Sequence, residues 1–219
     1  LRHMTPLYTT KSEYRAHARS LRASLPIDAI SQHIVDHLLR WPVFQSSDHV
    51  LLFYPMAQQH EIDLLALLTQ APDKQYYLPR MITPSENNSS DNEMIMAFFC
   101  YQLGDATDTH AYGVVEPKAT APAFQAITQP DRALLIAPAL LADHAGFRVG
   151  YGKSFYDRWL NTYAERSKTT PCPMLSTTVV VPNVLYVPSL PRDDWDTPLE
   201  AIITETGLFT AHDGHVKRV

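Results

Sequence analysis

The sequence predicts an α/β protein built on a single open, mostly parallel sheet with helices on both faces, the three-layer arrangement of Rossmann-like folds. Continuous apolar runs such as 50–54 (VLLFY) and 133–136 are typical of strands buried on both faces. These runs alternate with helical stretches, which is the order of a parallel sheet. The 219 residues are 45% hydrophobic and 19% charged, which excludes intrinsic disorder and allows a full core.

Two helices are predicted before the first strand. Residues 11–25 (KSEYRAHARSLRASL) are rich in Arg, Ala and Leu, lack Gly and Pro, and end at Pro26. In residues 28–41 the apolar side chains recur at spacings of three and four, which gives one apolar stripe before Pro42. Both stretches therefore favour α-helix.

The remaining elements continue the alternation. Helices are expected at 62–68 and 154–163, and strands at 50–54, 76–78 (closed by Pro79), 94–101, 133–136, 175–181 and 201–204. Residues 83–93 (TPSENNSSDNE) have no hydrophobic side chain to bury, so we expect an exposed loop. Residues 210–219 are predicted to be a polar, solvated tail. Because neither a repeat nor a linker is visible, we expect one domain over 1–219.

The amino-acid composition argues against several classes of binding partner. The net charge of −5 argues against a protein that coats nucleic acid, and no apolar run approaches the roughly 20 residues that span a bilayer. Cys100 and Cys172 are too few for a disulfide framework, so we expect free thiols in a reducing compartment. Residues 1–4 (LRHM) resemble a cloning remnant before a native start at Met4. We expect a cytoplasmic monomer that binds neither nucleic acid nor membrane.

Glycines point to a binding turn. The chain has seven, and three of them, Gly146, Gly150 and Gly152, fall where a strand should lead into a helix. Ligands of open α/β sheets bind at the carboxyl ends of strands, where glycine lets backbone N–H groups approach an anion and the helix dipole attracts it. Arg148 and Lys153 flank this turn and are suited to phosphate oxygens.

An ordinary strand-to-helix turn with solvated charges remains the competing interpretation, because a Gly-x-Gly pair is weak evidence by itself. The spacing matches neither a P-loop nor a dinucleotide-binding fingerprint. Asp157 lies in the following helix and has the carboxylate that Mg²⁺ prefers beside substrate phosphates.

Longer stretches around the turn are more specific. Residues 137–143 and 146–158 (GFRVGYGKSFYDR) resemble the signature of the 5-formyltetrahydrofolate cyclo-ligase family, the methenyltetrahydrofolate synthetases. Further segments resemble the family in the same order: 11–15 with Arg19 and Arg22, 54–63, 78–80, 112–117, 190–196 and 203–205. The resemblance therefore extends from about residue 11 to residue 205.

The resemblance implies an ATP- and Mg²⁺-dependent ring closure. ATP phosphorylates the formyl oxygen of 5-formyltetrahydrofolate, the folate N10 attacks the activated carbon, and phosphate leaves. The products are 5,10-methenyltetrahydrofolate, ADP and phosphate. An amide-like oxygen leaves poorly until it is phosphorylated, and enzymes assist phosphoryl transfer mainly by positioning and charge neutralisation.

The resemblance also implies residue roles. The catalytic residues would be Lys153, nearest the transferred group, and Arg148. The reduced folate would be held by Met56, Glu61 and Tyr151, and Mg²⁺ by Asp157 and Asp196. ATP would be contacted by nine residues: Lys11, Arg15, Arg148, Gly150, Tyr151, Gly152, Lys153, Ser154 and Tyr156.

Several of these residues have simpler interpretations. The basic residues of 11–22, at helical spacing, also fit a solvated face. Glu61 also fits a helix cap, and Asp196 competes with Asp193 and Asp194 for any metal role. We interpret His60 as a surface side chain and the histidines of the tail as solvated.

Three positions depart from the family pattern. Ser154 and Ala139 stand where the family usually has glycine, and Leu185 where it often has glutamine. Ser154 would be strained if its φ is positive. These departures keep open a folate- or nucleotide-binding regulator without turnover. A third alternative is a generic α/β enzyme of phosphorylated sugars that shares only the sheet topology.

Overall fold

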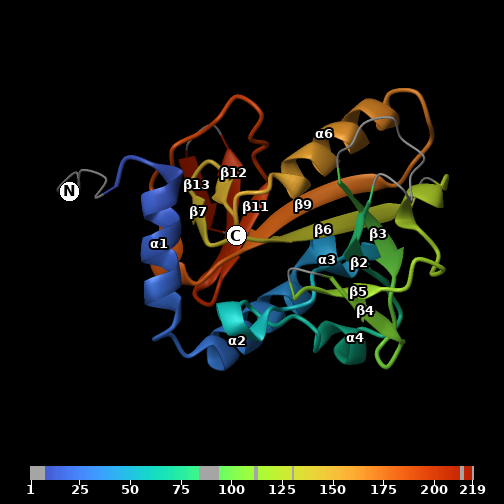
Figure 1. The fold of residues 1–219 in the computed structure, drawn as a ribbon, viewed down its shortest axis with the longest axis horizontal. Helices are drawn as coiled ribbons and strands as arrows, with labels where there is room; N and C mark the ends of the chain where they lie inside the picture. Colours follow the sequence, from blue (N-terminus) through green and yellow to red (C-terminus); the bar gives the residue numbers. More distant parts are fainter. Residues whose placement is uncertain (1–7, 84–93, 111–112, 130, 213–214, 219) are drawn as a thin grey trace.

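The computed structural model describes residues 8–83, 94–110, 113–129, 131–212 and 215–218, and its centre is an eight-stranded sheet (Figure 1). The strand order is β13-β12-β11-β9-β6-β1-β2-β3. The bounds are β1 (His49–Leu51), β2 (Gln75–Ile82), β3 (Ile95–Cys100), β6 (Arg132–Pro138), β9 (Met174–Val180), β11 (Ala201–Thr204), β12 (Gly207–His212) and β13 (His215–Arg218). The central strands are parallel and both margins are antiparallel, which confirms the predicted fold class.

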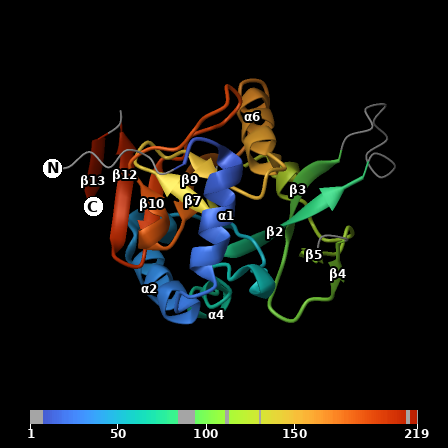
Figure 2. The same ribbon diagram turned by 60° about the vertical axis from the view of Figure 1, so that its left-hand side comes forward.

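Helices cover both faces of the sheet, as Figures 1 and 2 show. Their bounds are α1 (Lys11–Arg22), α2 (Ile27–Arg40), α3 (Pro42–Gln45), α4 (Leu67–Gln70) and α6 (Phe155–Ser167). Alternate side chains of β6 enter different cores: Leu135 packs in the cluster with Trp159 of α6, and Leu134 in the cluster with Ile34 of α2. This two-sided burial explains the continuous apolar sequence of the central strands.

A capping box fixes the start of α1. The Thr10 hydroxyl accepts a hydrogen bond from the Glu13 backbone N–H, and the Glu13 carboxylate accepts from the backbones of Thr10 and Thr9. Hydrogen bonds from Thr10 and then Thr9 lower the pKa of Glu13 to about 2. The helix therefore begins at Lys11, whose side chain emerges from its first turn.

A small sheet carries the chain from β6 toward α6. It contains β7 (Leu141–Asp143), β8 (Arg148–Val149) and β10 (Tyr186–Val187). The buried carboxylate of Asp143 holds the β7–β8 turn, since its Oδ1 accepts from the backbones of Ala145 and Phe147 at 3.0 Å each. Its Oδ2 accepts from Leu190 N at 3.1 Å. A further two-stranded sheet pairs β4 (Thr107–Thr109) with β5 (Val115–Pro117).

Two strand predictions needed correction. We expected Pro79 to close its strand, but β2 continues to Ile82. The missing proline N–H is tolerated because β1 pairs with β2 only as far as Tyr77, so beyond that residue β2 has one strand neighbour. The predicted tail 210–219 is wrong as well: β12 and β13 form a hairpin that extends the sheet beside β11. The polar composition of residues 210–219 left no apolar pattern by which these strands could be recognised.

The predicted helix 62–68 is also wrong, because only Leu67–Gln70 is helical. The preceding segment has other hydrogen bonds: Asp63 N donates to Ser31 Oγ at 2.9 Å, and Leu65 N donates to Asp63 Oδ1 at 2.8 Å. These side-chain acceptors compete with helix formation. Residues 1–4, and the predicted loop 83–93 apart from Thr83, lie outside the described part of the chain.

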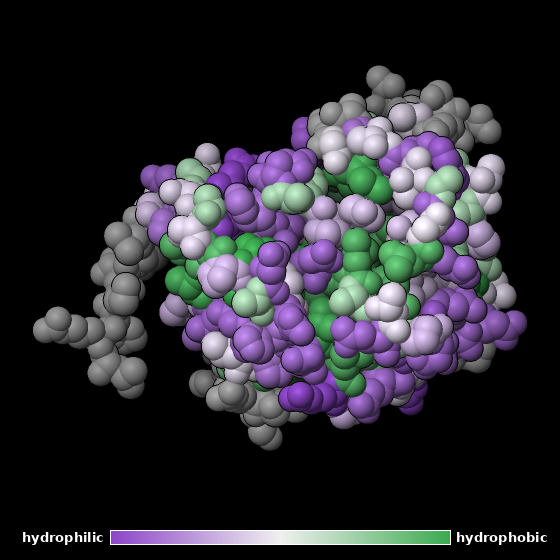
Figure 3. Space-filling view, turned by 90° about the horizontal axis from the view of Figure 1, so that it is seen from below, coloured by the Kyte–Doolittle hydropathy of each residue, from purple (hydrophilic) through white to green (hydrophobic). Residues whose placement is uncertain are grey.

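The surface is mostly hydrophilic on the face seen from below, where hydrophobic surface gathers in a hollow near the middle (Figure 3). Among the described helices, none has the length and apolar character needed to cross a bilayer. Cys100 and Cys172 are free thiols, as predicted, and both are half-buried.

Replacing Gly146 by alanine should destabilise the fold strongly. This residue has φ +84°, and an added Cβ would overlap the carbonyl oxygen of Leu199. Gly104, with φ +93° and open space around it, is a matched control that isolates the backbone strain. We expect Gly104→Ala to lose about 1 kcal/mol of unfolding free energy and Gly146→Ala at least about 2 kcal/mol more, measured by denaturant titration. Equal losses would contradict the overlap.

Candidate functional site

A cavity of about 340 Å³ opens beside the carboxyl ends of the parallel strands. Its walls come from the first turns of α1, the segments after β1, parts of β2 and β3, and the 148–157 turn. The structure brings together all thirteen site residues predicted from the sequence: Lys11, Arg15, Met56, Glu61, Arg148, Gly150, Tyr151, Gly152, Lys153, Ser154, Tyr156, Asp157 and Asp196. Their individual roles stay predictions.

Most of the cavity residues that the sequence did not reveal are apolar. They are Phe53, Tyr54, Gln59, Pro79, Met81, Met96, Val114, Pro138, Val149 and Phe155. Several directly follow or belong to strands, so their position at the strand ends was the available signal. In the sequence they were indistinguishable from core residues. They supply much of the apolar lining of the cavity.

Lys11 joins α1 to the 193–196 loop. Its Nζ lies 2.6 Å from Asp193 Oδ2 and 2.5 Å from Asp196 Oδ2. Burial by itself lowers the pKa of Lys11, but the hydrogen bonds and charges of both carboxylates outweigh it and raise the pKa above the ordinary lysine value. Lys11 is therefore a fixed cation at the cavity wall, and Asp193 shares it with Asp196.

Arg15 lies against the glycine turn one helical turn further along α1. Its Nε donates to the carbonyl oxygen of Gly150 at 2.9 Å. Gly152 has φ +96°, and an added Cβ there would lie 3.4 Å from the Arg15 guanidinium carbon. Glycine at this position permits the left-handed backbone, whereas an added Cβ would make only an ordinary contact with the arginine.

Arg148 and Asp157 form a buried ion pair at the start of α6. Arg148 Nη2 lies 3.1 Å from Asp157 Oδ1, and the side chains are 4% and 15% exposed. The Thr197 backbone links both partners, because its N–H donates to Asp157 at 3.1 Å and its carbonyl accepts from Arg148 Nη1 at 3.2 Å. Thr197 was not predicted, since backbone contacts leave no mark in the sequence.

Glu61 is a carboxylate in a largely apolar setting, and it is 5% exposed. Burial raises its pKa, while a 2.8 Å hydrogen bond from the Met56 backbone N–H, together with Tyr151 and Arg22, opposes that rise. Glu61 precedes no regular helix, so the helix-cap interpretation is wrong. Glu61 is one of the residues that line the cavity.

Two buried hydroxyls of the cavity residues, those of Tyr151 and Tyr156, make no complete hydrogen bond within the described structure, although Tyr151 interacts with Glu61. Burial raises the pKa of both tyrosines far above the ordinary value, so the hydroxyls stay neutral donors. Buried donors are costly unless satisfied. Their concentration here indicates a site for a ligand with polar acceptor atoms.

Ser154 is the N-cap of α6 and adopts the left-handed conformation, with φ +50° and ψ +24°. Its side chain makes no capping hydrogen bond. The strain predicted from the sequence is therefore present. Ala139, the other residue in place of a family glycine, does not have positive φ, so alanine is compatible with its backbone. Leu185 is buried at 1% exposure and belongs to the core.

The described residues contain no group of three or more His, Cys, Asp or Glu side chains arranged to hold a metal ion. Asp157 and Asp196 nevertheless fit an ion that shares its ligands with phosphate. Each carboxylate uses one oxygen in the contacts above, and the other oxygen accepts no hydrogen bond from the described residues.

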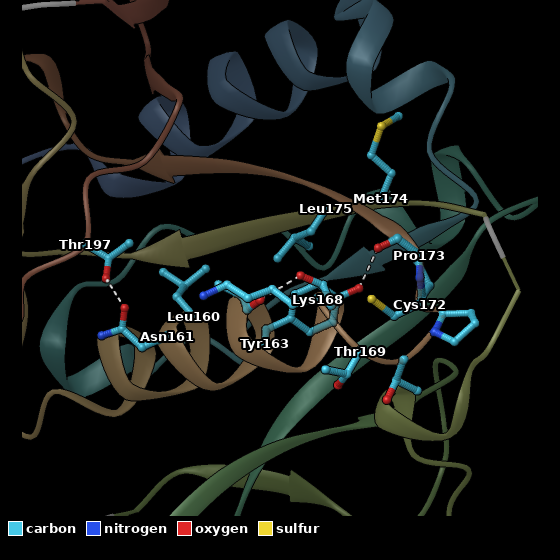
Figure 4. A pocket seen from close by; sticks show the side chains of 14 residues that line it. Leu160, Asn161, Tyr163, Lys168, Thr169, Cys172, Pro173, Met174, Leu175 and Thr197 are labelled. Atoms are coloured by element: carbon cyan, nitrogen blue, oxygen red, sulfur yellow. Dashed lines mark hydrogen bonds between the residues drawn. The ribbon is translucent and has the colours of Figure 1, made fainter.

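A second hollow, of about 660 Å³, lies between the later turns of α6 and the segment before β9 (Figure 4). Its polar contacts are internal to the fold: the Tyr163 hydroxyl donates to the Pro173 carbonyl at 2.6 Å, and Thr197 Oγ1 donates to Asn161 at 3.4 Å. No predicted site residue lines it. We therefore place the chemistry in the smaller cavity.

An open α/β sheet with cations, buried carboxylates and unsatisfied donors around one cavity at its carboxyl edge has the construction of an enzyme that binds small anionic substrates. The comparison with known sequences makes this class specific. The chain belongs to the 5-formyltetrahydrofolate cyclo-ligase family, whose sequence pattern matches residues 9–205. The family predicted from the motifs is thereby confirmed.

Curated relatives agree with this assignment. The chain is 25% identical over 182 residues to the 5-formyltetrahydrofolate cyclo-ligase of Escherichia coli (strain K12), covering 82% of this chain and 90% of the relative. It is 24% identical over 202 residues to that of Haemophilus influenzae, covering 88% and 96%.

Two solved structures share the fold. The NMR structure of the Aquifex aeolicus 5,10-methenyltetrahydrofolate synthetase aligns with a TM-score of 0.70 at 23% identity, covering 96% of this chain and 97% of that one. The Mycoplasma pneumoniae 5,10-methenyltetrahydrofolate synthetase aligns with a TM-score of 0.57 at 16% identity, covering 90% and 99%.

Replacing Ser154 by glycine should stabilise the protein. Glycine adopts the left-handed region without the steric cost that serine has there, although it also gives the unfolded chain more freedom. We expect Ser154→Gly to gain about 0.5–1 kcal/mol of unfolding free energy in a denaturant titration. Ser154→Ala, which keeps Cβ and loses a hydroxyl that makes no cap, should gain nothing. A similar gain in both variants would show that φ is not the cause.

Proposed function

We propose that the protein catalyses the ATP- and Mg²⁺-dependent conversion of 5-formyltetrahydrofolate to 5,10-methenyltetrahydrofolate, with release of ADP and phosphate. The observation that carries the proposal is the single cavity, in which two cation–carboxylate pairs and a buried glutamate surround unsatisfied hydroxyl donors. Membership of the cyclo-ligase family supports it. The substrates would be small molecules, and the cytoplasmic location and monomeric state stay predictions.

The nucleotide phosphates would lie along the glycine turn. Gly150, Gly152 and Ser154 offer backbone there, with Tyr151 and Tyr156 beside them, and the start of α6 adds a favourable dipole. Lys11, Arg15, Arg148 and Lys153 supply positive charge from α1 and from the turn. Lys153 is exposed, so its side chain is able to reach a bound phosphoryl group.

The reduced folate would occupy the apolar side of the cavity. The polar edge of its ring system carries N–H donors, and the Glu61 carboxylate is the matching acceptor. Met56 and Tyr151 lie beside Glu61 in the cavity lining, and Met81 and Met96 extend the apolar wall. In this proposal a folate ring and the phosphates of ATP would share the same cavity.

Asp157 and Asp196 would hold Mg²⁺ through their second carboxylate oxygens, and the ion would neutralise phosphate charge when bound. Arg148 and Lys153 would stabilise the negative charge on the phosphoryl group as the formyl oxygen takes it from ATP and ADP leaves. The folate N10 would then form its bond to the formyl carbon and lose its proton to solvent, and the C–O bond would break with release of phosphate.

A non-catalytic folate- or nucleotide-binding regulator is the second candidate, and the left-handed Ser154 favours it because that residue lies in the phosphate-facing turn. The generic enzyme of phosphorylated sugars is no longer supported, since the family match covers residues 9–205. Binding of 5-formyltetrahydrofolate without ATP-dependent turnover would identify the regulator.

Lys153→Ala and Asp157→Ala should each abolish turnover while the protein remains folded. The assay mixes the protein with 5-formyltetrahydrofolate and Mg²⁺, with and without ATP, and follows absorbance of the methenyl product. Removing the cation nearest the transferred group or a metal-binding carboxylate should cost at least about 10²-fold in kcat. Lys168→Ala, which removes an exposed cation paired with Glu165 on α6, is the matched control and should keep full activity. Full activity in either site variant would refute the assigned roles.

A further inference from the structure

Part of the apolar lining of the cavity comes from the far end of strand β2 and from its neighbours. Pro79 and Met81 both line the cavity, because alternate residues of a strand point to the same face. Met96 of β3 is the cross-strand partner of Met81 and lines the cavity as well. Val114, directly before β5, adds to this surface. Pro79, Met81, Met96 and Val114 thus form one apolar wall, the β2 wall.

Strand β2 is held in an unusual way along this wall. β1 pairs with β2 only as far as Tyr77, and beyond that residue β2 pairs with β3 alone among the described strands. On the other edge, the Met81 backbone N–H donates to Oε1 of Glu116 in β5 at 2.9 Å. Glu116 is 2% exposed, so water competes little for this hydrogen bond. A side chain of β5 therefore supplies the acceptor that a neighbouring strand would otherwise provide.

Further polar contacts fix β5 against β2. Arg80, which lies between the two wall residues of β2, has its Nη1 3.7 Å from Glu116 Oε2 and donates to the carbonyl oxygen of Pro117 at 2.9 Å. The same nitrogen donates to Asp108 of β4 at 2.9 Å, and Asp108 also pairs with Lys118. None of these five described residues lines the cavity. The β4–β5 sheet thus holds the β2 wall from behind.

Resting on the proposed function, we propose that Glu116 is a positioning residue for the reduced folate. By holding the backbone of Met81, its carboxylate fixes the apolar wall against which the folate ring system would pack while Glu61 receives the N–H donors of the ring. Glu116 itself does not touch the substrate. The role depends on the reach of an acceptor oxygen and not on its charge, because a backbone N–H needs only an acceptor. The nucleotide side is unaffected, since α1 and the 148–157 turn form it.

Two conservative variants separate reach from charge. Glu116→Gln keeps the side-chain length and an acceptor oxygen but loses the charge, whereas Glu116→Asp keeps the charge and withdraws the oxygen by one methylene. With each substrate varied separately in the ring-closure assay, Glu116→Asp should raise KM for 5-formyltetrahydrofolate at least about fivefold and leave KM for ATP within about twofold. Glu116→Gln should leave both KM values within about twofold. Glu165→Asp, the same change at an exposed glutamate of α6, is the matched control and should leave both unchanged.

A double-mutant cycle tests whether Glu116 acts through the wall. Because Met81→Ala removes the side chain that the hydrogen bond positions, Glu116→Asp should raise the folate KM less than about twofold in that background. Glu116→Met, which removes the acceptor, replaces Glu116→Asp with the same expectation if the aspartate variant does not fold. An unchanged folate KM in these variants, a larger rise in Glu116→Gln, equal rises in both KM values, or full additivity in the cycle would overturn the proposal.

Failure of the proposed function has a different signature. If the wild type shows no ATP-dependent ring closure, calorimetric titration with 5-formyltetrahydrofolate alone replaces the kinetics. Binding by Glu116→Asp that is at least about fivefold weaker than binding by the wild type and by Glu116→Gln would uphold the role of Glu116 in a protein without turnover. Absence of folate binding to the wild type, or equal affinity in all three proteins, would overturn it.

Discussion

Helix α1 directs three of its basic side chains, Lys11, Arg15 and Arg22, inward, and the site depends on the contacts that compensate them. Lys11 is paired with the 193–196 loop, Arg15 with the glycine turn through Gly150, and Arg22 with the exit of β6 through Ala139. One helix thereby holds three segments that are far apart in the sequence. The capping box that starts the helix at Lys11 fixes the register of all three contacts. Without this helix, the cavity would lose one wall and two of the four cations that line it, Lys11 and Arg15.

The sequence predicted the sheet well where strands are buried on both faces, and poorly where local contacts or the sheet margin determine the structure. Strands buried on both faces appear as continuous apolar runs, and 201–204 was predicted with the observed bounds. The failures have local causes. Side-chain acceptors such as Ser31 replaced helical hydrogen bonds after Glu61. The terminal hairpin lies at the sheet margin, and its polar sequence has no strand pattern. Very short strands such as β7 and β8 have no periodicity to detect.

The candidate site was predictable to the extent that its chemistry uses distinctive residue types. Glycines, cations and carboxylates stand out in the sequence, and all those selected line one cavity. The residues that sequence reasoning missed contribute in ways that residue type does not reveal. Thr197 acts through its backbone, and Asp193 shares Lys11 with Asp196. Met81 and Met96 contribute apolar surface to the cavity lining. Arg22 was noted only as part of a basic helix, because burial is a property of the fold.

The paired charges explain how one cavity would accommodate two anionic substrates. Without ligand, Lys11 and Arg148 are compensated by Asp196 and Asp157, so the cavity wall is nearly neutral and stable. Phosphates and a divalent ion would satisfy the same groups by exchange of partners.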